Sequence, residues 1–123
     1  GINCITIKWS EDSEISELSN SDIGIMPLIK TRFALGKCGY KLIQYMGVGI
    51  PVVASNIGAN NKIVKNSENG FLADTQDDWF YYLKMLLENL DLRDRLGRNG
   101  RRMVKDRYSV QITEKTFISF FNE

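Results

Sequence analysis

The sequence predicts an α/β fold, in which a parallel sheet carries helices on both faces. Segments typical of strands alternate along the chain with segments typical of helices, and residues 50–54 form an unbroken apolar run. Such a run is typical of a strand buried on both faces, and strands that alternate with helices pair in parallel through crossovers. The 123 residues have the length of one domain. We therefore expect a Rossmann-like arrangement of one sheet between two layers of helices.

The first part of the chain predicts two strands and one helix. Residues 3–9 are β-rich and alternate in polarity, which predicts a strand. Ser10 is a good N-cap for a helix that ends near Asn20, and three acidic residues suit its first turn: Glu11, Asp12 and Glu14. Residues 22–28, closed by Pro27, predict a second strand, and residues 29–35 predict a basic loop.

The remaining elements follow from helical spacing and turn residues. A helix is predicted at residues 37–48, ended by Gly47 and Gly49, and its inward-facing side chains are Leu42, Ile43, Tyr45 and Met46. After the apolar strand we expect three short elements: a polar turn at 55–61, one helical turn at 62–65 and an edge strand at 70–73. Three helices are then expected: one capped by Thr75 or Asp74 and running through Asn89, one at 92–108 and one at 110–121.

Composition limits the classes of function open to the chain. Hydrophobic residues make up 43% and charged residues 25%, as in ordinary globular proteins, and no apolar run approaches the roughly 20 residues that span a membrane. The chain has no histidine, and Cys4 and Cys38 lie in different elements, so we expect no metal site and a reduced, cytoplasmic environment. The net charge of +1, without an interleaved basic and aromatic motif, argues against nucleic acid as a partner.

Acidic residues are missing from a long central stretch. No Asp or Glu lies between Asp22 and Glu68, where even spacing of the 15 acidic residues would place about five. The basic residues in this stretch are Lys30, Arg32, Lys37, Lys41, Lys62 and Lys65. This asymmetry favours a phosphate-bearing ligand, and a chance gap on a solvated face is the alternative.

A segment rich in glycine and lysine lies within this stretch, after the second predicted strand. Ligands of parallel α/β sheets bind where the carboxyl ends of the strands meet. Gly36 and Gly39 would let backbone amides approach a diphosphate, and Lys37 and Lys41 share a face if the helix begins near Lys37. Glycines required only by a turn are the alternative interpretation. The predicted diphosphate and sugar site is Gly36, Lys37, Cys38, Gly39, Tyr40 and Lys41.

A more specific string follows. Residues 44–55 read Gln-Tyr-Met-Gly-Val-Gly-Ile-Pro-Val-Val-Ala-Ser. This string resembles the C-terminal, donor-binding domain of family 4-like (group 1 type) glycosyltransferases of GT-B fold, in which an E-x7-E loop and helix precede A-M-A-x-G-x-P-V-V-A-[ST]. The match continues at Gly58, at Ile63 and Val64, at residues 68–72 (Glu-Asn-Gly-Phe-Leu) and at residues 107–109 (Arg-Tyr-Ser). The resemblance covers nearly the whole chain.

The resemblance implies roles for individual residues. Gln44 stands at the second glutamate of E-x7-E, which holds the ribose hydroxyls in the family, and an amide can both donate and accept there. Gly36 stands at the first glutamate, beside the donor sugar, so that carboxylate is lost and no catalytic residue is assigned. Lys37 and Lys41 would bind the diphosphate of a nucleoside-diphosphate sugar, with no metal or other cofactor.

The resemblance also implies partners and a location. Family members place the acceptor site in a separate N-terminal domain. Residues 1–123 would then be the later part of the donor-binding domain, closed by helices at about 90–123 and inactive alone. The implied reaction is transfer with retention of configuration, in cell-surface polysaccharide biosynthesis. A basic helix face at residues 93–107 allows peripheral contact with the inner membrane face, and a solvated face is the alternative.

A non-catalytic function is the competing hypothesis. The lost carboxylates at Gly36 and Gln44 also fit a degenerate Rossmann-like module that binds a nucleotide or a protein. Binding of a nucleotide sugar without transfer would distinguish such a module from an enzyme.

Overall fold

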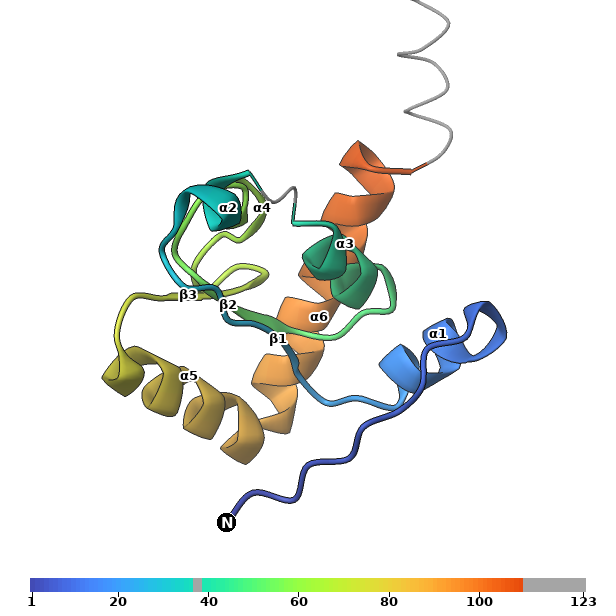
Figure 1. The fold of residues 1–123 in the computed structure, drawn as a ribbon. Helices are drawn as coiled ribbons and strands as arrows, with labels where there is room; N and C mark the ends of the chain where they lie inside the picture. The colour runs from blue at the N-terminus through green and yellow to red at the C-terminus, as the bar shows by residue number, and fades with distance from the viewer. Residues whose placement is uncertain (37–38, 110–123) are drawn as a thin grey trace, which may run out of the picture.

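A computed structural model describes residues 1–36 and 39–109 of the chain (Figure 1). These residues form three strands, which are β1 (Gly24–Met26), β2 (Val52–Ser55) and β3 (Gly70–Ala73). The helices are α1 (Glu11–Ser19), α2 (Arg32–Leu35), α3 (Tyr40–Gly47), α4 (Asn60–Ile63), α5 (Gln76–Glu88) and α6 (Leu90–Arg107).

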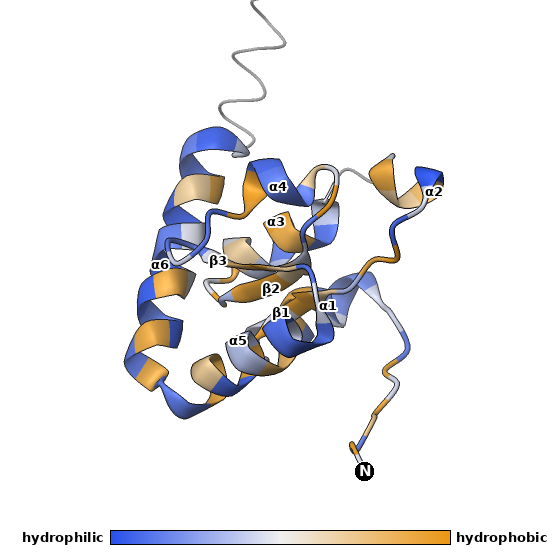
Figure 2. Cartoon of the chain, turned by 90° about the vertical axis from the view of Figure 1, so that its left-hand side faces the viewer, coloured by the Kyte–Doolittle hydropathy of each residue, from blue (hydrophilic) through white to orange (hydrophobic). Residues whose placement is uncertain are grey.

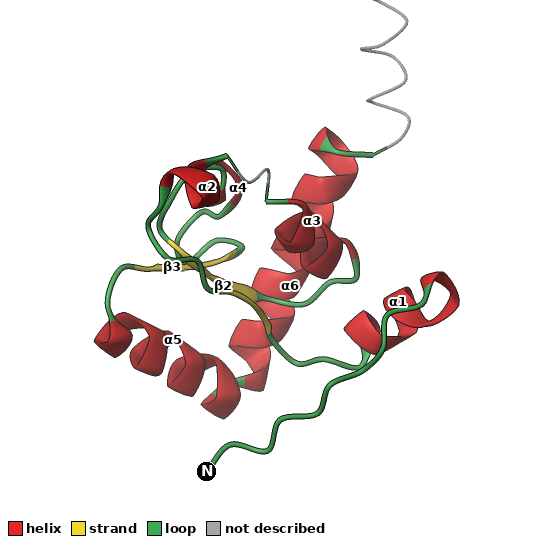
Figure 3. Cartoon of the chain, in the orientation of Figure 1, coloured by secondary structure: helices red, strands yellow, loops and turns green. Residues whose placement is uncertain are grey.

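The strands form one parallel sheet in the order β1-β2-β3, which confirms the predicted parallel α/β fold. Ile25 pairs with Val53, and Val53 pairs with Phe71. The central strand β2 is buried at every position, as its apolar run predicted. Figures 2 and 3 show helices on both sides of the sheet, with α3 and α4 on one side and α5 on the other.

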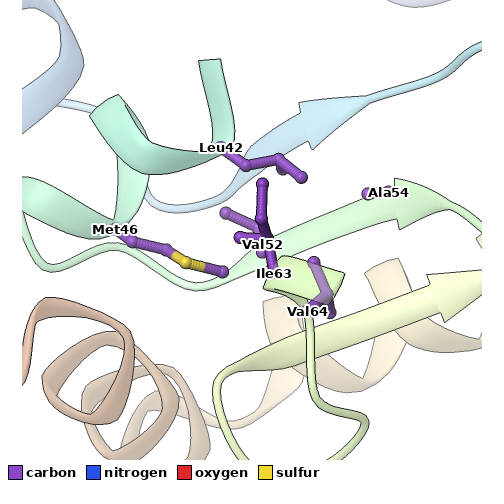
Figure 4. Close-up of a cluster of buried hydrophobic side chains, with 6 residues drawn as sticks. All are labelled: Leu42, Met46, Val52, Ala54, Ile63 and Val64. Atoms are coloured by element: carbon purple, nitrogen blue, oxygen red, sulfur yellow. The ribbon is translucent and has the colours of Figure 1, made fainter. Parts of the chain in front are cut away.

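Two hydrophobic clusters hold these layers together, one on each face of the sheet. Alternate residues of β2 face opposite clusters, because successive side chains of a strand point to opposite faces. The first cluster, drawn in Figure 4, consists of Leu42, Met46, Val52, Ala54, Ile63 and Val64. The second consists of Val53, Phe71, Ala73, Leu86 and Leu96. Helix α6 contributes to both, because Met103 and Val104 pack on the first cluster and Leu96 belongs to the second.

Side-chain N-caps explain most of the helix starts in the described residues, and two of these caps, Ser10 and Thr75, were predicted. Thr75 and Asp78 form a capping box at the start of α5. Backbone amides of Asp74 and Thr75 donate to Asp78 Oδ2 at 2.9 Å each, and these hydrogen bonds lower the pKa of that carboxyl. Helix α6 begins at Leu90 rather than residue 92, because Asn89 Oδ1 accepts from Leu92 N at 2.9 Å.

The prediction of a strand at residues 3–9 is wrong. These residues form no strand, and Ile5, Ile7 and Trp9 expose 83%, 57% and 68% of their surface. Alternation of polar and apolar residues favours a strand only where a neighbouring strand accepts its hydrogen bonds, and this segment does not pair with the sheet. Figure 1 shows it running past α1 as an extended chain.

Three further boundaries differ from the predictions. The basic loop at residues 29–35 contains α2, which Thr31 caps by accepting from Ala34 N at 3.1 Å. The helix predicted from residue 37 begins at Tyr40, because Gly39 is left-handed. The single turn predicted at 62–65 lies at Asn60–Ile63. The helix predicted at 110–121 lies outside the described residues.

Candidate functional site

The carboxyl ends of the parallel strands meet along one edge of the sheet, and the loops that leave them are joined by hydrogen bonds. Leu28 N donates to Ser55 Oγ at 2.7 Å, which joins the first loop to the second. Asn56 N donates to Ala73 O at 3.1 Å, and Asn56 Nδ2 donates to Asp74 Oδ2 at 3.0 Å. These hydrogen bonds therefore link the loops at the edge of the sheet where ligands of such sheets bind.

Helix α3 starts with Gly39 as its N-cap. Gly39 has a φ of 71°, and a Cβ at this position would lie 2.5 Å from Ile63 Cδ1. The left-handed conformation favours glycine, and the approach to Ile63 would require that side chain to shift if a Cβ were present. The first backbone amides of a helix have no acceptor within the helix, and Gly39 has no side chain that could supply one.

The predicted site residues are only partly brought together. Gly36 is the C-cap of α2 and Gly39 the N-cap of α3, while Lys37 and Cys38 lie outside the described residues. Tyr40 is exposed, and the side chain of Lys41 is 44% exposed. Because α3 begins at Tyr40, the condition on which Lys37 and Lys41 would share a helix face is not met.

Lys41 and Gln44 meet at a third residue, Glu14 of α1. Gln44 Nε2 donates to Glu14 Oε1 at 2.9 Å, and Lys41 Nζ lies 3.9 Å from the same oxygen. The sequence analysis placed Glu14 only in the first turn of a helix. Its spacing of 30 residues from Gln44 carries no local signal, since the contact depends on how α1 packs on α3.

The two polar atoms of the Gln44 amide differ in their contacts, because the nitrogen donates to Glu14 and the oxygen has no partner among the described residues. Gln44 Oε1 is buried and has no hydrogen-bond partner among the described residues. Tyr45, the next residue, packs its ring over Gly24 of β1, and burial raises the pKa of its hydroxyl. Lys41 Nζ lies 6.0 Å from the centroid of that ring. The amide oxygen of Gln44 can therefore accept a hydrogen bond that the described residues do not supply.

Two of the cavities on the described part of the chain differ in whether predicted site residues line them. The larger, of about 360 Å³, lies between α6 and the loop before β3, and its lining includes Lys65, Asn69 and Arg102. None of the predicted site residues lines it. The smaller, of about 270 Å³, is lined by Lys41 and Glu14 together with residues 7–10 of the extended segment. The smaller cavity is therefore the one that adjoins the candidate site.

The described residues do not meet the requirements of a metal site or of a membrane-spanning helix. They contain no group of three or more His, Cys, Asp or Glu side chains placed to hold a metal ion. Within the same residues, every helix is too short or too polar to pass through a lipid bilayer.

Comparison with protein families gives one match, to the family described as glycosyl transferases group 1, over residues 1–103. The chain is 28% identical over 122 residues to the capsular polysaccharide biosynthesis glycosyltransferase CapM of Staphylococcus aureus, covering 98% of this chain and 30% of that protein. It is 27% identical over 109 residues to glycosyltransferase 1 domain-containing protein 1 of Xenopus tropicalis, covering 84% and 31%. The chain spans about a third of the length of these relatives.

Solved structures match in fold. The C-terminal domain of LpcC, a glycosyl transferase group 1 family protein from Francisella tularensis, superposes with a TM-score of 0.72 at 24% identity, covering 87% of this chain and 53% of that one. Sucrose-phosphate synthase from Thermosynechococcus elongatus matches with a TM-score of 0.67 at 24% identity, covering 87% and 27%.

Proposed function

The chain belongs to the group 1 glycosyltransferases, and we propose that it binds the nucleoside-diphosphate sugar from which the whole protein transfers a sugar to an acceptor. The observation that carries this proposal is the position of Lys41. It stands in the first turn of α3, two residues after the glycine that caps that helix, within a stretch that lacks acidic residues. An ammonium group and a helix N-terminus both favour a bound diphosphate.

Lys41 is free to exchange its present partner for a phosphate. Its ammonium lies 3.9 Å from Glu14 Oε1, and its side chain is 44% exposed. Ion pairs with this exposure contribute only about 0–1 kcal/mol, whereas a charge-assisted hydrogen bond to phosphate contributes about 1.5–3 kcal/mol. In the proposed reaction Lys41 neutralises the charge that develops on the diphosphate leaving group, and this electrostatic role needs no metal.

The rest of the proposed function concerns the whole protein. Because the chain spans about a third of its relatives, the acceptor site is assigned to a further, N-terminal domain. Retention of configuration and a cytoplasmic location at the inner membrane face belong to the same proposal. The name of CapM, a relative in capsular polysaccharide biosynthesis, favours a cell-surface polysaccharide as the product.

Replacing Lys41 with alanine tests the proposed site. In the full-length protein, Lys41→Ala is expected to weaken binding of UDP or GDP, whichever the protein binds, by roughly 10- to 150-fold, the equivalent of about 1.5–3 kcal/mol. Isothermal titration calorimetry measures both affinities. Lys84→Ala removes an exposed lysine from α5, outside the site, and should leave the affinity unchanged. Equal affinity of the wild type and Lys41→Ala would refute the role of Lys41.

The degenerate module remains the second candidate, because neither Gly36 nor Gln44 carries the carboxylate of the E-x7-E motif. It predicts that the full-length protein binds a nucleotide sugar and neither transfers nor hydrolyses it. Release of the nucleoside diphosphate in the presence of acceptor would exclude this candidate.

A further inference from the structure

Glu14 touches the side chains of Lys41 and Gln44, two of the predicted donor-binding residues of α3. We infer that Glu14 supplies from α1 the carboxylate that position 44 lacks, so that Glu14 and Gln44 together bind the vicinal hydroxyls of the nucleotide ribose. This inference rests on the proposed function, since it requires that a nucleotide binds at α3. It assigns a ligand contact to a residue of another helix, 30 positions away in sequence.

The contact with Glu14 fixes which way the Gln44 amide faces. Its Nε2 donates to the Glu14 carboxylate at 2.9 Å, and the reversed amide would place two oxygens at that distance. The amide oxygen is thereby left as an acceptor, and it is buried without a partner among the described residues. A buried acceptor that lacks a donor costs free energy, and a ligand hydroxyl is the donor that would satisfy it.

Glu14 provides the second acceptor. A carboxylate has two oxygens with about four lone-pair sites, and the Gln44 amide uses one of them. The Glu14 side chain is 23% exposed, so it is shielded from bulk water but still accessible to a ligand. Two adjacent acceptors, one neutral and one charged, complement two hydroxyls on neighbouring carbons, which is the arrangement that the ribose 2′ and 3′ positions present.

Lys41 lies beside Glu14, which places the proposed diphosphate contact next to the proposed ribose contacts. Glu14 and Lys41 line the smaller cavity, of about 270 Å³, which lies just below the roughly 300–1,000 Å³ of pockets for drug-sized ligands and suits a single ring. When Lys41 turns from Glu14 to a phosphate, the Glu14 carboxylate loses its ammonium neighbour and gains room for a hydroxyl.

A purely structural role, in which Glu14 only ties α1 to α3, is the rival explanation, and 2′-deoxynucleotides separate the two. The affinities of the full-length protein for UDP and GDP are compared with those for dUDP and dGDP. The wild type should prefer the ribonucleotide, and Glu14→Gln should reduce that preference by about tenfold. Glu11→Gln, at an exposed position in the first turn of the same helix, should leave the preference unchanged.

A charge exchange sharpens the test. Gln44→Glu alone places two carboxylates in contact and should lose the ribose preference, whereas Glu14→Gln combined with Gln44→Glu restores one amide and one carboxylate and should recover it. Melting temperatures report any structural loss separately. The inference is overturned if Glu14→Gln leaves the ribonucleotide preference intact, or if only the affinity for the sugar conjugate changes, since the diol would then belong to the sugar. Absence of nucleotide binding in the wild type would instead overturn the proposed function.

Discussion

Replacing Leu42 with alanine is expected to lower the free energy of unfolding by about 2–5 kcal/mol. Leu42 is fully buried on the inner face of α3 and belongs to the same cluster as Val52 and Ile63 (Figure 4). Deleting its side chain removes buried apolar surface and leaves a cavity between α3 and the sheet. Since α3 also carries Lys41 and Gln44, nucleotide binding should weaken in the same variant. Urea denaturation followed by circular dichroism measures the stability.

Tyr40 supplies the matched control for this prediction. It precedes Lys41 in the same helix, but 65% of its surface is exposed. Tyr40→Ala should therefore change the stability by no more than about 0.5 kcal/mol. Similar losses in Leu42→Ala and Tyr40→Ala would contradict the packing of α3 described above.

Gly97→Ala is expected to destabilise the protein by about 2 kcal/mol, although alanine is the better helix former. A Cβ at Gly97 would lie 2.1 Å from Gly49 O and 2.9 Å from Gly49 C, in the segment that joins α3 to β2. Both contacts are backbone atoms, so α6 itself would have to move. The cost of overpacking, roughly 1–3 kcal/mol and at its upper end for a backbone clash, outweighs the roughly 1 kcal/mol gained in helix propensity.

Gly47→Ala is the matched control, because it gains helix propensity without overpacking. It is the last residue of α3, and the nearest atom to a Cβ there would be Val104 Cγ1, at an ordinary contact distance of 3.9 Å. Gly47→Ala should therefore leave the melting temperature unchanged or slightly higher. If Gly97→Ala is as stable as Gly47→Ala, α6 does not pack on Gly49 as closely as the structure describes.

The sequence signals that predicted the fold correctly are local or periodic. The unbroken apolar run before Ser55 indicated a strand buried on both faces, and Thr75 or Asp74 indicated a helix start, because an N-cap needs only neighbouring residues. The inward positions Leu42 and Met46 followed from helical spacing. The resemblance to a known family implied roles for individual residues, which periodicity does not provide.

Three of the differences have a common cause, which is that each depended on a partner distant in the sequence. Residues 3–9 have the pattern of a strand, but a strand also needs an edge to pair with. The left-handed Gly39, which delays the start of α3, lies against Ile63 of α4. The contact of Glu14 with Gln44 could not be predicted, since only the packing of α1 on α3 brings the two residues together.

The central claim, that a nucleoside diphosphate binds where α3 meets the carboxyl edge of the sheet, is tested most directly by amide NMR. The isotope-labelled full-length protein is titrated with UDP, GDP and their sugar conjugates. The account predicts saturable shifts that cluster at residues 36–44 and 55–60, around the N-cap of α3 and the loop after β2. Saturable shifts that cluster instead at Lys65, Asn69 and Arg102, around the larger cavity, would contradict it.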